Sequence, residues 1–532
     1  MTPEPFSISK YLPVLFLLIF LSFFAHLGNT PLFDADEGAY SEVTREMMVH
    51  QDFTVALLNG MPFFHKPPLF YWAQAASIKI LGQNELALRL PSAIAALLWV
   101  ISVFLFARRF YDTATAWHGA LFMSASLLVT FIGRAATPEV LLNLFLTLTL
   151  LNIYRFYHSG NKRHIYWTFM FAALGVLTKG VIALLLPVAV SFSFFGINKR
   201  WKDLMVLFTN PVGLIVFGLI VIPWYLGEFM LHGKAFLNDQ LLLQGTESLN
   251  HNFIGGSLPY YSYPFFILIG LLPFTAIFIR AAFHIRKLLS DDLIKFMVLW
   301  FVMALLFLPL SPPKSVFSIA YGFPPLFIIM ARTADIFHHS IILFIGPLLF
   351  MALLLLMPYM APFIAGSIHH EFTRNALSDG VELLDTFYQM CLGVTIFLLA
   401  ILAFIRSVPA PVKFGILALL FVSIINFLVL PIIGDIFQQP IKSAALLAKQ
   451  DKHKVINWRI RRPSFNVYAE MLTEERTPAA GDIVLTKTEF LGNDMEYERL
   501  FEKQGVILVK ILALHASGTN SIQRKESKLF RK

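Results

Sequence analysis

The sequence contains little charge and a single cysteine. Of its 532 residues, 14% are charged, whereas 57% are hydrophobic and 54 are Phe. Soluble globular domains usually carry about 25% charged residues, so this composition excludes a water-soluble globule. The single cysteine, Cys391, excludes a disulfide within the chain and leaves the redox compartment open. The composition therefore predicts a polytopic membrane protein.

Long apolar runs predict the helices that cross the membrane. Runs of roughly 17 to 25 residues are long enough to span the hydrocarbon core as helices, so we expect an all-α bundle of about thirteen spans. The runs lie near residues 11–28, 86–107, 114–133, 139–157, 165–178, 181–197, 206–226, 262–280, 293–310, 315–333, 340–362, 388–405 and 414–433.

Basic residues gather in short loops at every second connection between these runs. Arg108 with Arg109 and Lys199 with Arg200 are examples. The net charge of +9 is therefore explained by loops that orient helices, which argues against a nucleic-acid partner. The positive-inside rule places these loops and the N-terminus in the cytoplasm. An odd number of spans then puts loop 29–85 and the C-terminal segment on the opposite face. The first run lacks a cleavage site, so we expect it to be retained.

Two domains are predicted. Residues 1–435 form the transmembrane domain, in which loop 29–85 is too long to be a simple connector. Residues 436–532 mix helical periodicity with short β-branched segments such as GDIVLTKTEF, which predicts a small soluble α/β domain. No internal repeat is evident along the chain.

Three carboxylates lie close together in the stretch FDADEGAYSEVTREM, at Asp34, Asp36 and Glu37. One interpretation is purely structural, because Asp34 and Glu37 have the spacing of a capping box at a helix start. It leaves Asp36 unexplained. Tyr40, Val43 and Met47 recur with helical spacing. We therefore expect an amphipathic helix over 37–49 in the membrane interface, with its carboxylates facing water.

A second stretch of the same loop, FFHKPPLFYW, places Lys66 between aromatic residues and two prolines. Its ammonium is expected near the headgroup level. Either it anchors the loop by snorkelling, or it binds an anionic ligand.

Further charges recur at the ends of spans on the same predicted face, namely Arg134, Glu139, Lys179 and Lys314. Each alone is typical of an interfacial anchor, whereas together they form the charge pattern that an anionic substrate needs. Asp36, His65 and His251 are candidate ligands for a divalent metal, although no local spacing requires one.

Four segments resemble the GT-C integral-membrane glycosyltransferases, in the branch of the protein O-mannosyltransferase superfamily that includes bacterial lipid A aminoarabinose transferases. The segments are DADEGAYSEVTREM, LLNGMPFFHKPPLFYW, GRAATPEVLLN and ALGVLTKGVIALLLP. The resemblance implies a GT-C fold, a sugar donor carried on polyprenyl phosphate, no nucleotide cofactor, and transfer on the periplasmic face of a bacterial inner membrane.

Roles for individual residues follow from this resemblance. Asp36 matches the essential loop acid of the family and Glu37 follows it, so both are candidate catalytic residues. Lys66 matches the lysine that meets the donor phosphate. The remaining candidates are assigned to the donor phosphate (Arg134, Lys179 and Lys314) and to acceptor binding or support (Asp34, Tyr40, Glu139 and Tyr321).

The sequence departs from the aminoarabinose enzymes at three positions. Ala39 stands where those enzymes have Arg, and His65 stands where they have Glu. Ser318 stands where they have Tyr, with Tyr321 about one helical turn further on. The resemblance therefore does not identify the sugar.

The leading prediction is a glycosyltransferase that moves a sugar from polyprenyl phosphate to a lipid or glycan acceptor, with inversion at the sugar carbon. The rival is a transporter or flippase of lipid-linked sugars, which would bind the same ligand without chemistry. Transporters usually place charges at mid-membrane within inverted repeats, whereas these charges lie at span ends. A third possibility is a membrane-anchored structural protein, for which the outer carboxylates would be dispensable.

Overall fold

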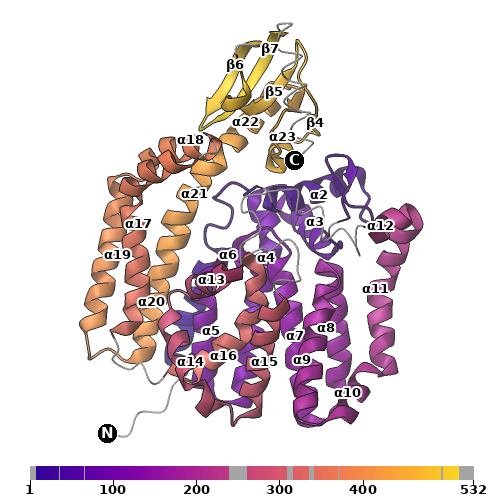
Figure 1. The fold of residues 1–532 in the computed structure, drawn as a ribbon, viewed down its shortest axis with the longest axis vertical. Coiled ribbons are helices and arrows are strands. Elements are labelled where there is room, and N and C mark those ends of the chain that lie inside the picture. Colours follow the sequence, from indigo (N-terminus) through magenta and orange to yellow (C-terminus); the bar gives the residue numbers. More distant parts are fainter. Residues whose placement is uncertain are drawn as a thin grey trace.

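A computed structural model describes residues 8–34, 36–64, 66–238, 260–307, 316–334, 341–368, 371–492 and 495–514. The protein consists of a large helical bundle and a small sheet domain that sits on one end of the bundle (Figure 1). The prediction of a helical membrane domain followed by a small α/β domain is confirmed at this level.

Among the described residues, six helices are long and apolar enough to cross a membrane, or eight if each of two bent helix pairs counts as one span. The six are α4 (Glu85–Phe110), α7 (Glu139–Ser159), α11 (Pro211–His232), α17 (Ile342–Ser367), α19 (Thr386–Phe404) and the continuous stretch Ala410–Phe437, which contains α20 (Ala410–Ile424) and α21 (Leu430–Phe437). Shorter helices occupy the other predicted runs, among them α1 (Ile8–Ile19), α8 (Arg163–Lys179), α9 (Ile182–Ile197), α15 (Asp292–Phe307) and α16 (Phe323–Ala331).

The two bent pairs meet at their breaks. The axis turns by 64° between α5 (Thr113–Ala125) and α6 (Leu127–Arg134), and by 117° between α13 (Tyr263–Gly270) and α14 (Thr275–Leu288). Ser126 Oγ donates to Gly270 O at 2.7 Å, and Leu127 N donates to Leu272 O at 3.0 Å. Each break therefore satisfies polar groups freed by the other, as backbone buried in a membrane domain requires.

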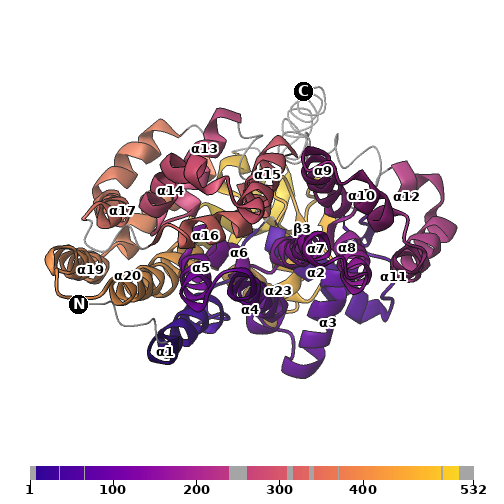
Figure 2. The same cartoon turned by 90° about the horizontal axis from the view of Figure 1, so that it is seen from below.

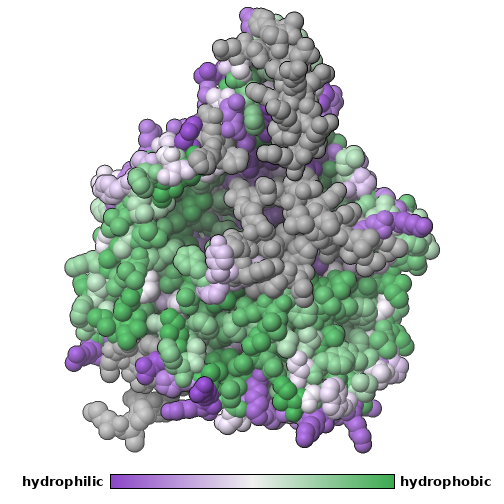
Figure 3. Space-filling model, in the orientation of Figure 1, coloured by the Kyte–Doolittle hydropathy of each residue, from purple (hydrophilic) through white to green (hydrophobic). Residues whose placement is uncertain are grey.

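Buried aromatic side chains fill the centre of the bundle. Trp99, Trp117 and Trp300 come from α4, α5 and α15 and are fully buried. Seen from below, α4, α5, α7 and α16 lie centrally, whereas α11 and α19 lie at opposite edges (Figure 2). Apolar side chains cover the visible flank of the bundle, and hydrophilic residues gather at its lower end and on the sheet domain (Figure 3).

Loop 29–85 is folded and lies between the bundle and the sheet domain. It contains α2 (Asp36–His50), a hairpin of β1 (Leu57–Leu58) and β2 (Met61–Pro62), and α3 (Leu69–Leu81). Asn59 and Gly60 form the hairpin turn, with φ values of +55° and +75°. This left-handed backbone is the conformation that an Asn-Gly pair adopts readily.

The prediction that the carboxylates of the helix over 37–49 face water is wrong. Tyr40, Val43 and Met47 pack on an apolar cluster as expected, but Glu37, Glu42 and Glu46 are also buried. The reason is that α2 packs against α3 on the bundle and against α23 (Pro463–Ala469) of the sheet domain. Because this face is covered, the charged side chains of Arg45 and Glu46 have partners within the protein. Arg45 pairs with Glu42 at 2.6 Å, and Glu46 accepts hydrogen bonds from the backbone of the hairpin turn.

The sheet domain begins with α22 (Gln439–Gln450) and contains β3 (Val455–Asn457), β4 (Glu474–Glu475), β5 (Ile483–Lys487), β6 (Met495–Lys503) and β7 (Val506–Leu514). The strand order is β4-β3-β5-β7-β6. β3 pairs in parallel with β4 and β5, whereas β7 pairs antiparallel with β5 and β6. Separate apolar clusters lie on the two faces of the sheet. Helices α22 and α23 pack on one face and contribute to its cluster.

Candidate functional site

Asp36 is the first residue of α2, at the end of the bundle that faces the sheet domain. Its side chain is exposed to solvent, yet protein atoms crowd it enough for desolvation to dominate its titration. Desolvation raises the pKa of Asp36, and the neighbouring carboxylate of Glu139 raises it further. Lys179 and Lys66 oppose the shift, and the net direction is upward. Two cations and a second carboxylate therefore act directly on the predicted catalytic acid.

Lys179 and Glu139 form an ion pair where two helices end. Lys179 is the last residue of α8 and Glu139 the first of α7, so each helix dipole favours the charge placed on it. Lys179 Nζ donates to Glu139 and, at 3.0 Å, to the hydroxyl of Tyr321. The Tyr321 hydroxyl in turn donates to Glu139 Oε2 at 3.4 Å. Glu139 and Tyr321 are buried.

Tyr40 is close enough to Asp36 and to Glu139 for both charges to act on it. It lies one helical turn after Asp36 on α2, and its ring packs 6.4 Å from that of Phe70 and 6.2 Å from that of Tyr71. Desolvation raises the pKa of Tyr40, and the charges of Asp36 and Glu139 act in the same direction. Six predicted site residues are thus brought together, from five segments of the chain: Asp36, Tyr40, Lys66, Glu139, Lys179 and Tyr321. Lys66 is half-buried just before α3.

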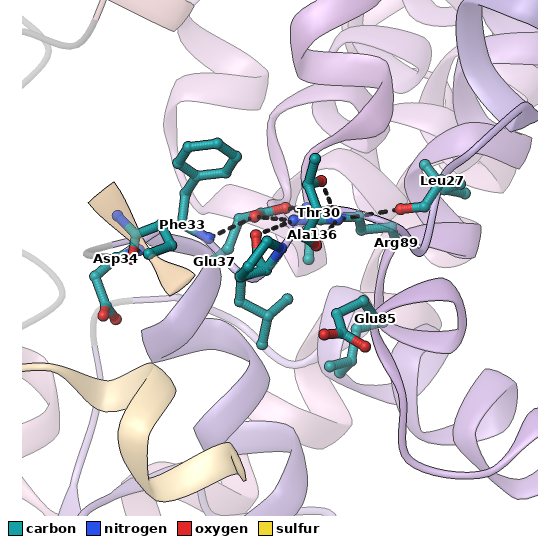
Figure 4. A network of polar contacts seen from close by, with 12 residues as sticks. Leu27, Thr30, Phe33, Asp34, Glu37, Glu85, Arg89 and Ala136 are labelled. Atoms are coloured by element: carbon teal, nitrogen blue, oxygen red, sulfur yellow. Dashed lines mark hydrogen bonds and ion pairs between the residues drawn. The ribbon is translucent and has the colours of Figure 1, made fainter. Parts of the chain in front are cut away.

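Glu37 lies in a buried network with Arg89 of α4 (Figure 4). Arg89 donates Nε to Glu37 Oε1 at 3.0 Å and Nη2 to Oε2 at 2.8 Å. Glu37 also accepts from Phe33 N at 2.8 Å and Ala136 N at 2.5 Å. Arg89 further donates to the carbonyls of Leu27, Thr30 and Pro31. Glu37 therefore ties the start of α2 to α4 and to the α6–α7 connection.

Arg89 was not among the sequence-predicted site residues. A signal for it exists, because Arg89 is the only ionisable residue in the predicted apolar run 86–107. Such residues inside membrane segments usually have a specific partner. Nothing in the sequence identified that partner as Glu37, which lies 52 positions away.

Arg134 lies near the Glu37–Arg89 network rather than near Lys179. It ends α6, is buried, and donates Nη1 to Ser22 O at 3.3 Å. The charges that act on it are those of Arg89 and Glu37. Two of the expected phosphate-binding cations, Arg134 and Lys179, therefore lie in different networks.

Asp34 contacts the sheet domain. Its Oδ1 accepts from Ser464 N at 3.0 Å, and its Oδ2 accepts from Ser464 Oγ at 2.5 Å. The capping-box interpretation is thus wrong for Asp34, whose carboxylate binds α23 rather than its own helix. Burial raises the pKa of Asp34 despite these bonds and the nearby Arg462.

Three predicted site residues, His65, His251 and Lys314, lie outside the described residues. Within the described ranges, no group of three or more His, Cys, Asp or Glu side chains is arranged to hold a metal ion.

The chain is similar to known proteins in sequence and in fold. Residues 65–226 match the family of dolichyl-phosphate-mannose-protein mannosyltransferases. The chain is 29% identical over 324 residues to an uncharacterized protein of Aquifex aeolicus (strain VF5), covering 60% of this chain and 63% of that protein. It is 27% identical over 335 residues to the undecaprenyl phosphate-alpha-4-amino-4-deoxy-L-arabinose arabinosyl transferase of Aeromonas salmonicida (strain A449), covering 61% and 59%. The matches thus span about three fifths of these curated relatives.

The crystal structure of ArnT from Cupriavidus metallidurans bound to undecaprenyl phosphate superposes with a TM-score of 0.76 at 16% identity, over 94% of this chain and 97% of that one. The apo form of that protein gives the same values. The fold is therefore that of the GT-C membrane glycosyltransferases. The chain is similar to that mannosyltransferase family over residues 65–226 and to the aminoarabinose transferase over about three fifths of its length, which supports the resemblance drawn from the four sequence motifs.

Proposed function

We propose that this protein transfers a sugar from a polyprenyl-phosphate donor to a hydroxyl of a lipid A-like lipid or a glycan. The observation that carries the proposal is the convergence of Asp36 with Lys66 and with the Lys179–Glu139–Tyr321 group. The names of the relatives support this donor class, as does the undecaprenyl phosphate bound to the structural neighbour.

The geometry suits a direct displacement. The acceptor oxygen attacks the sugar carbon, the bond from that carbon to the phosphate oxygen breaks, and the configuration inverts. Asp36 takes the acceptor proton as general base, a role that a raised pKa favours. Lys66 and Lys179 stabilise the negative charge that develops on the departing polyprenyl phosphate. Glu37 holds α2 in place rather than touching the substrate, because its carboxylate is fully engaged by Arg89 and two backbone amides.

The site is proposed to lie on the periplasmic face of a bacterial inner membrane, which the chain is proposed to cross about thirteen times. Supporting this orientation, Lys199 and Arg200 lead into α10 (Trp201–Phe208), which lies at the end of the bundle opposite the sheet domain (Figure 1). Basic loops favour the cytoplasmic side. The sheet domain and the site would then both be periplasmic.

A divalent metal near Asp36 stays a prediction, since His65 and His251 lie outside the described residues. Dialysis of the purified protein against a chelator tests it. Loss of transfer that Mg²⁺, Mn²⁺ or Zn²⁺ restores would give Asp36 a metal-binding role. Full activity after chelation would leave Asp36 as a base.

The direct test offers the purified protein a panel of radiolabelled polyprenyl-phosphate pentoses and hexoses together with membrane lipids. Transfer should occur with at least one donor and be lost in Asp36→Asn. Asp52→Asn, an exposed acid of the same loop, is the matched control and should retain transfer. Absence of transfer from every donor by the unmodified protein would contradict the proposal.

The flippase alternative predicts a different product. In proteoliposomes, a flippase would move the lipid-linked sugar between leaflets without changing its mass. The proposed enzyme would instead release free polyprenyl phosphate and a glycosylated acceptor, which mass spectrometry separates.

A further inference from the structure

The short helix α23 of the sheet domain contacts two arms of loop 29–85. The first arm is the segment that leads to Asp36, and the second is the segment that runs from the hairpin turn at Asn59 to Lys66. Two residues before Asp36, Asp34 accepts two hydrogen bonds from Ser464, and Asp34 N donates to Gln438 Oε1 at 3.2 Å. Further back on the first arm, Leu32 N donates to the hydroxyl of Tyr468 at 2.8 Å. The backbone that leads into Asp36 is therefore fixed by the sheet domain.

The second arm carries Lys66 and is held through Asn59 at the hairpin turn. Asn59 Oδ1 accepts from Asn466 Nδ2 and from Thr473 N, both at 3.1 Å. Asn59 Nδ2 donates to Thr473 O at 2.7 Å. Inside the sheet domain, Thr473 Oγ1 donates to Asn466 Oδ1 at 2.9 Å, which joins these contacts into one unit. The amide of Asn59 is thus bound on both sides by the sheet domain.

Close backbone approach provides independent support. A Cβ atom on Gly38 would lie 2.2 Å from Asp34 Oδ1 and 2.7 Å from Ser464 N. Only glycine at this position of α2 lets α23 come so near. Ser464 and Asn466 are themselves buried, so their polar groups would lose hydrogen bonds that water cannot easily replace if α23 moved.

We propose that α23 sets the spacing between Asp36 and Lys66, and that Ser464 and Asn466 are positioning residues for the transfer step. This inference rests on the proposed function. Ser464 holds the arm that carries Asp36 and Asn466 the arm that carries Lys66, and the two residues lie two positions apart on one short helix. A displacement of about 1 Å at a reacting group can cost about 10²-fold in rate. The contribution should therefore appear in kcat rather than in donor binding.

Kinetics of Ser464→Ala, Asn466→Ala and the double variant test the role. Each single variant should lower kcat at least tenfold while the donor KM stays within threefold. The kcat of the double variant should lie no more than threefold below that of the less active single variant. The reason is that the spacing between Asp36 and Lys66 is already lost once either arm is released. Ser464→Thr, which keeps the hydroxyl, should recover most of the loss.

Thr486→Val is the matched control. Thr486 Oγ1 donates to Trp458 O at 2.8 Å inside the same domain, so this variant removes one buried hydrogen bond without touching loop 29–85. Its kcat should stay within twofold of the unmodified protein. If Ser464→Ala and Asn466→Ala match this control, or if their losses simply multiply, the proposal is overturned.

A distance measurement separates this inference from the proposed function. Spin labels at Asn29→Cys and Met61→Cys, in a Cys391→Ser background, report on the two arms at exposed positions. Pulsed electron paramagnetic resonance should give one narrow distance distribution in this parent and in its Thr486→Val variant. The Ser464→Ala/Asn466→Ala pair should broaden it. An unchanged distribution overturns the role of α23 whether or not sugar is transferred, whereas missing transfer by the unmodified protein contradicts only the proposed function.

Discussion

Glu37 and Arg89 form a two-bonded ion pair directly beside Asp36, with Arg89 Nη2 2.8 Å from Glu37 Oε2 and Nε 3.0 Å from Oε1. Both side chains are buried. Adjacent carboxylates of one motif thus serve different purposes. Asp36 faces the cations of the candidate site, whereas Glu37 anchors the helix that presents it.

Removing one partner of this pair should destabilise the protein strongly. Leaving a buried charge unpaired typically costs about 3–5 kcal/mol, so Arg89→Ala and Glu37→Gln should both lower Tm markedly. Arg89→Lys should recover little, because an ammonium cannot reproduce the planar fork. Thermal unfolding in detergent measures this. Arg476→Ala, which breaks an exposed pair with Asp482, is the control and should change Tm only slightly. A Glu37→Gln protein with unchanged Tm but no transfer would restore a catalytic role to Glu37.

Lys66→Ala should reduce turnover by orders of magnitude if its ammonium binds the donor phosphate. A loss of about 3 kcal/mol in a partly desolvated pocket corresponds to about 10²-fold. Lys66→Arg should rescue only part of this, since the fork is larger and planar. Steady-state kinetics with Lys79→Ala as control decide the matter, because Lys79 is an exposed lysine on α3. Equal effects of the two alanine variants would return Lys66 to a snorkelling anchor.

Lys179 is expected to contribute less than Lys66, since Glu139 already neutralises part of its charge. Lys179→Met should lower both turnover and Tm, because it leaves the buried Glu139 unpaired. Adding Glu139→Gln should restore Tm but not turnover. Lys314→Ala should also give a smaller loss than Lys66→Ala if Lys314 binds phosphate. Recovery of turnover in the Lys179→Met/Glu139→Gln protein would remove Lys179 from the site.

The acid limb of the pH profile should report Asp36. Desolvation and Glu139 hold its pKa above the ordinary aspartate value of about 3.9. A base must be ionised, so kcat/KM should fall as the pH drops through this raised pKa. The same shift means that the folded state favours the protonated acid, and Asp36 therefore stabilises the fold less as the pH rises from its ordinary to its raised pKa. An acid limb at or below the ordinary value would exclude Asp36 as the base.

Much of this architecture was predictable from local sequence. Every predicted apolar range overlaps a described helix, because burial in lipid requires long apolar runs with internally bonded backbone. The breaks at Ser126 and Leu272 were not foreseen, since each is stabilised by the other, 146 positions away. The hairpin turn also has a local signal, because the Asn-Gly pair in LLNGMP favours the left-handed backbone that Asn59 and Gly60 adopt.

The site was predicted only in part. Asp36, Lys66, Glu139, Lys179 and Tyr321 were proposed from family motifs, and the structure gathers them. The partners of Asp34 and Glu37 were not predicted, because Ser464 and Arg89 reach them from distant parts of the chain. The face of α2 that was predicted to face water is covered by the sheet domain, and no local sequence pattern predicts where that domain lies.

Gly38→Ala offers the sharpest test of the contact between α2 and α23. Alanine favours a helix over glycine by about 0.5–1 kcal/mol, so local propensity predicts a more stable α2. The structure predicts the opposite, because the added Cβ would lie 2.2 Å from Asp34 Oδ1 and 2.7 Å from Ser464 N. We expect lower Tm, faster proteolysis of the sheet domain and reduced transfer. The control is Gly393→Ala in α19, where a Cβ meets nothing within 4 Å, and this variant should leave all three unchanged or raise Tm. If Gly38→Ala stabilised the protein as the control does, α23 would not be held against α2.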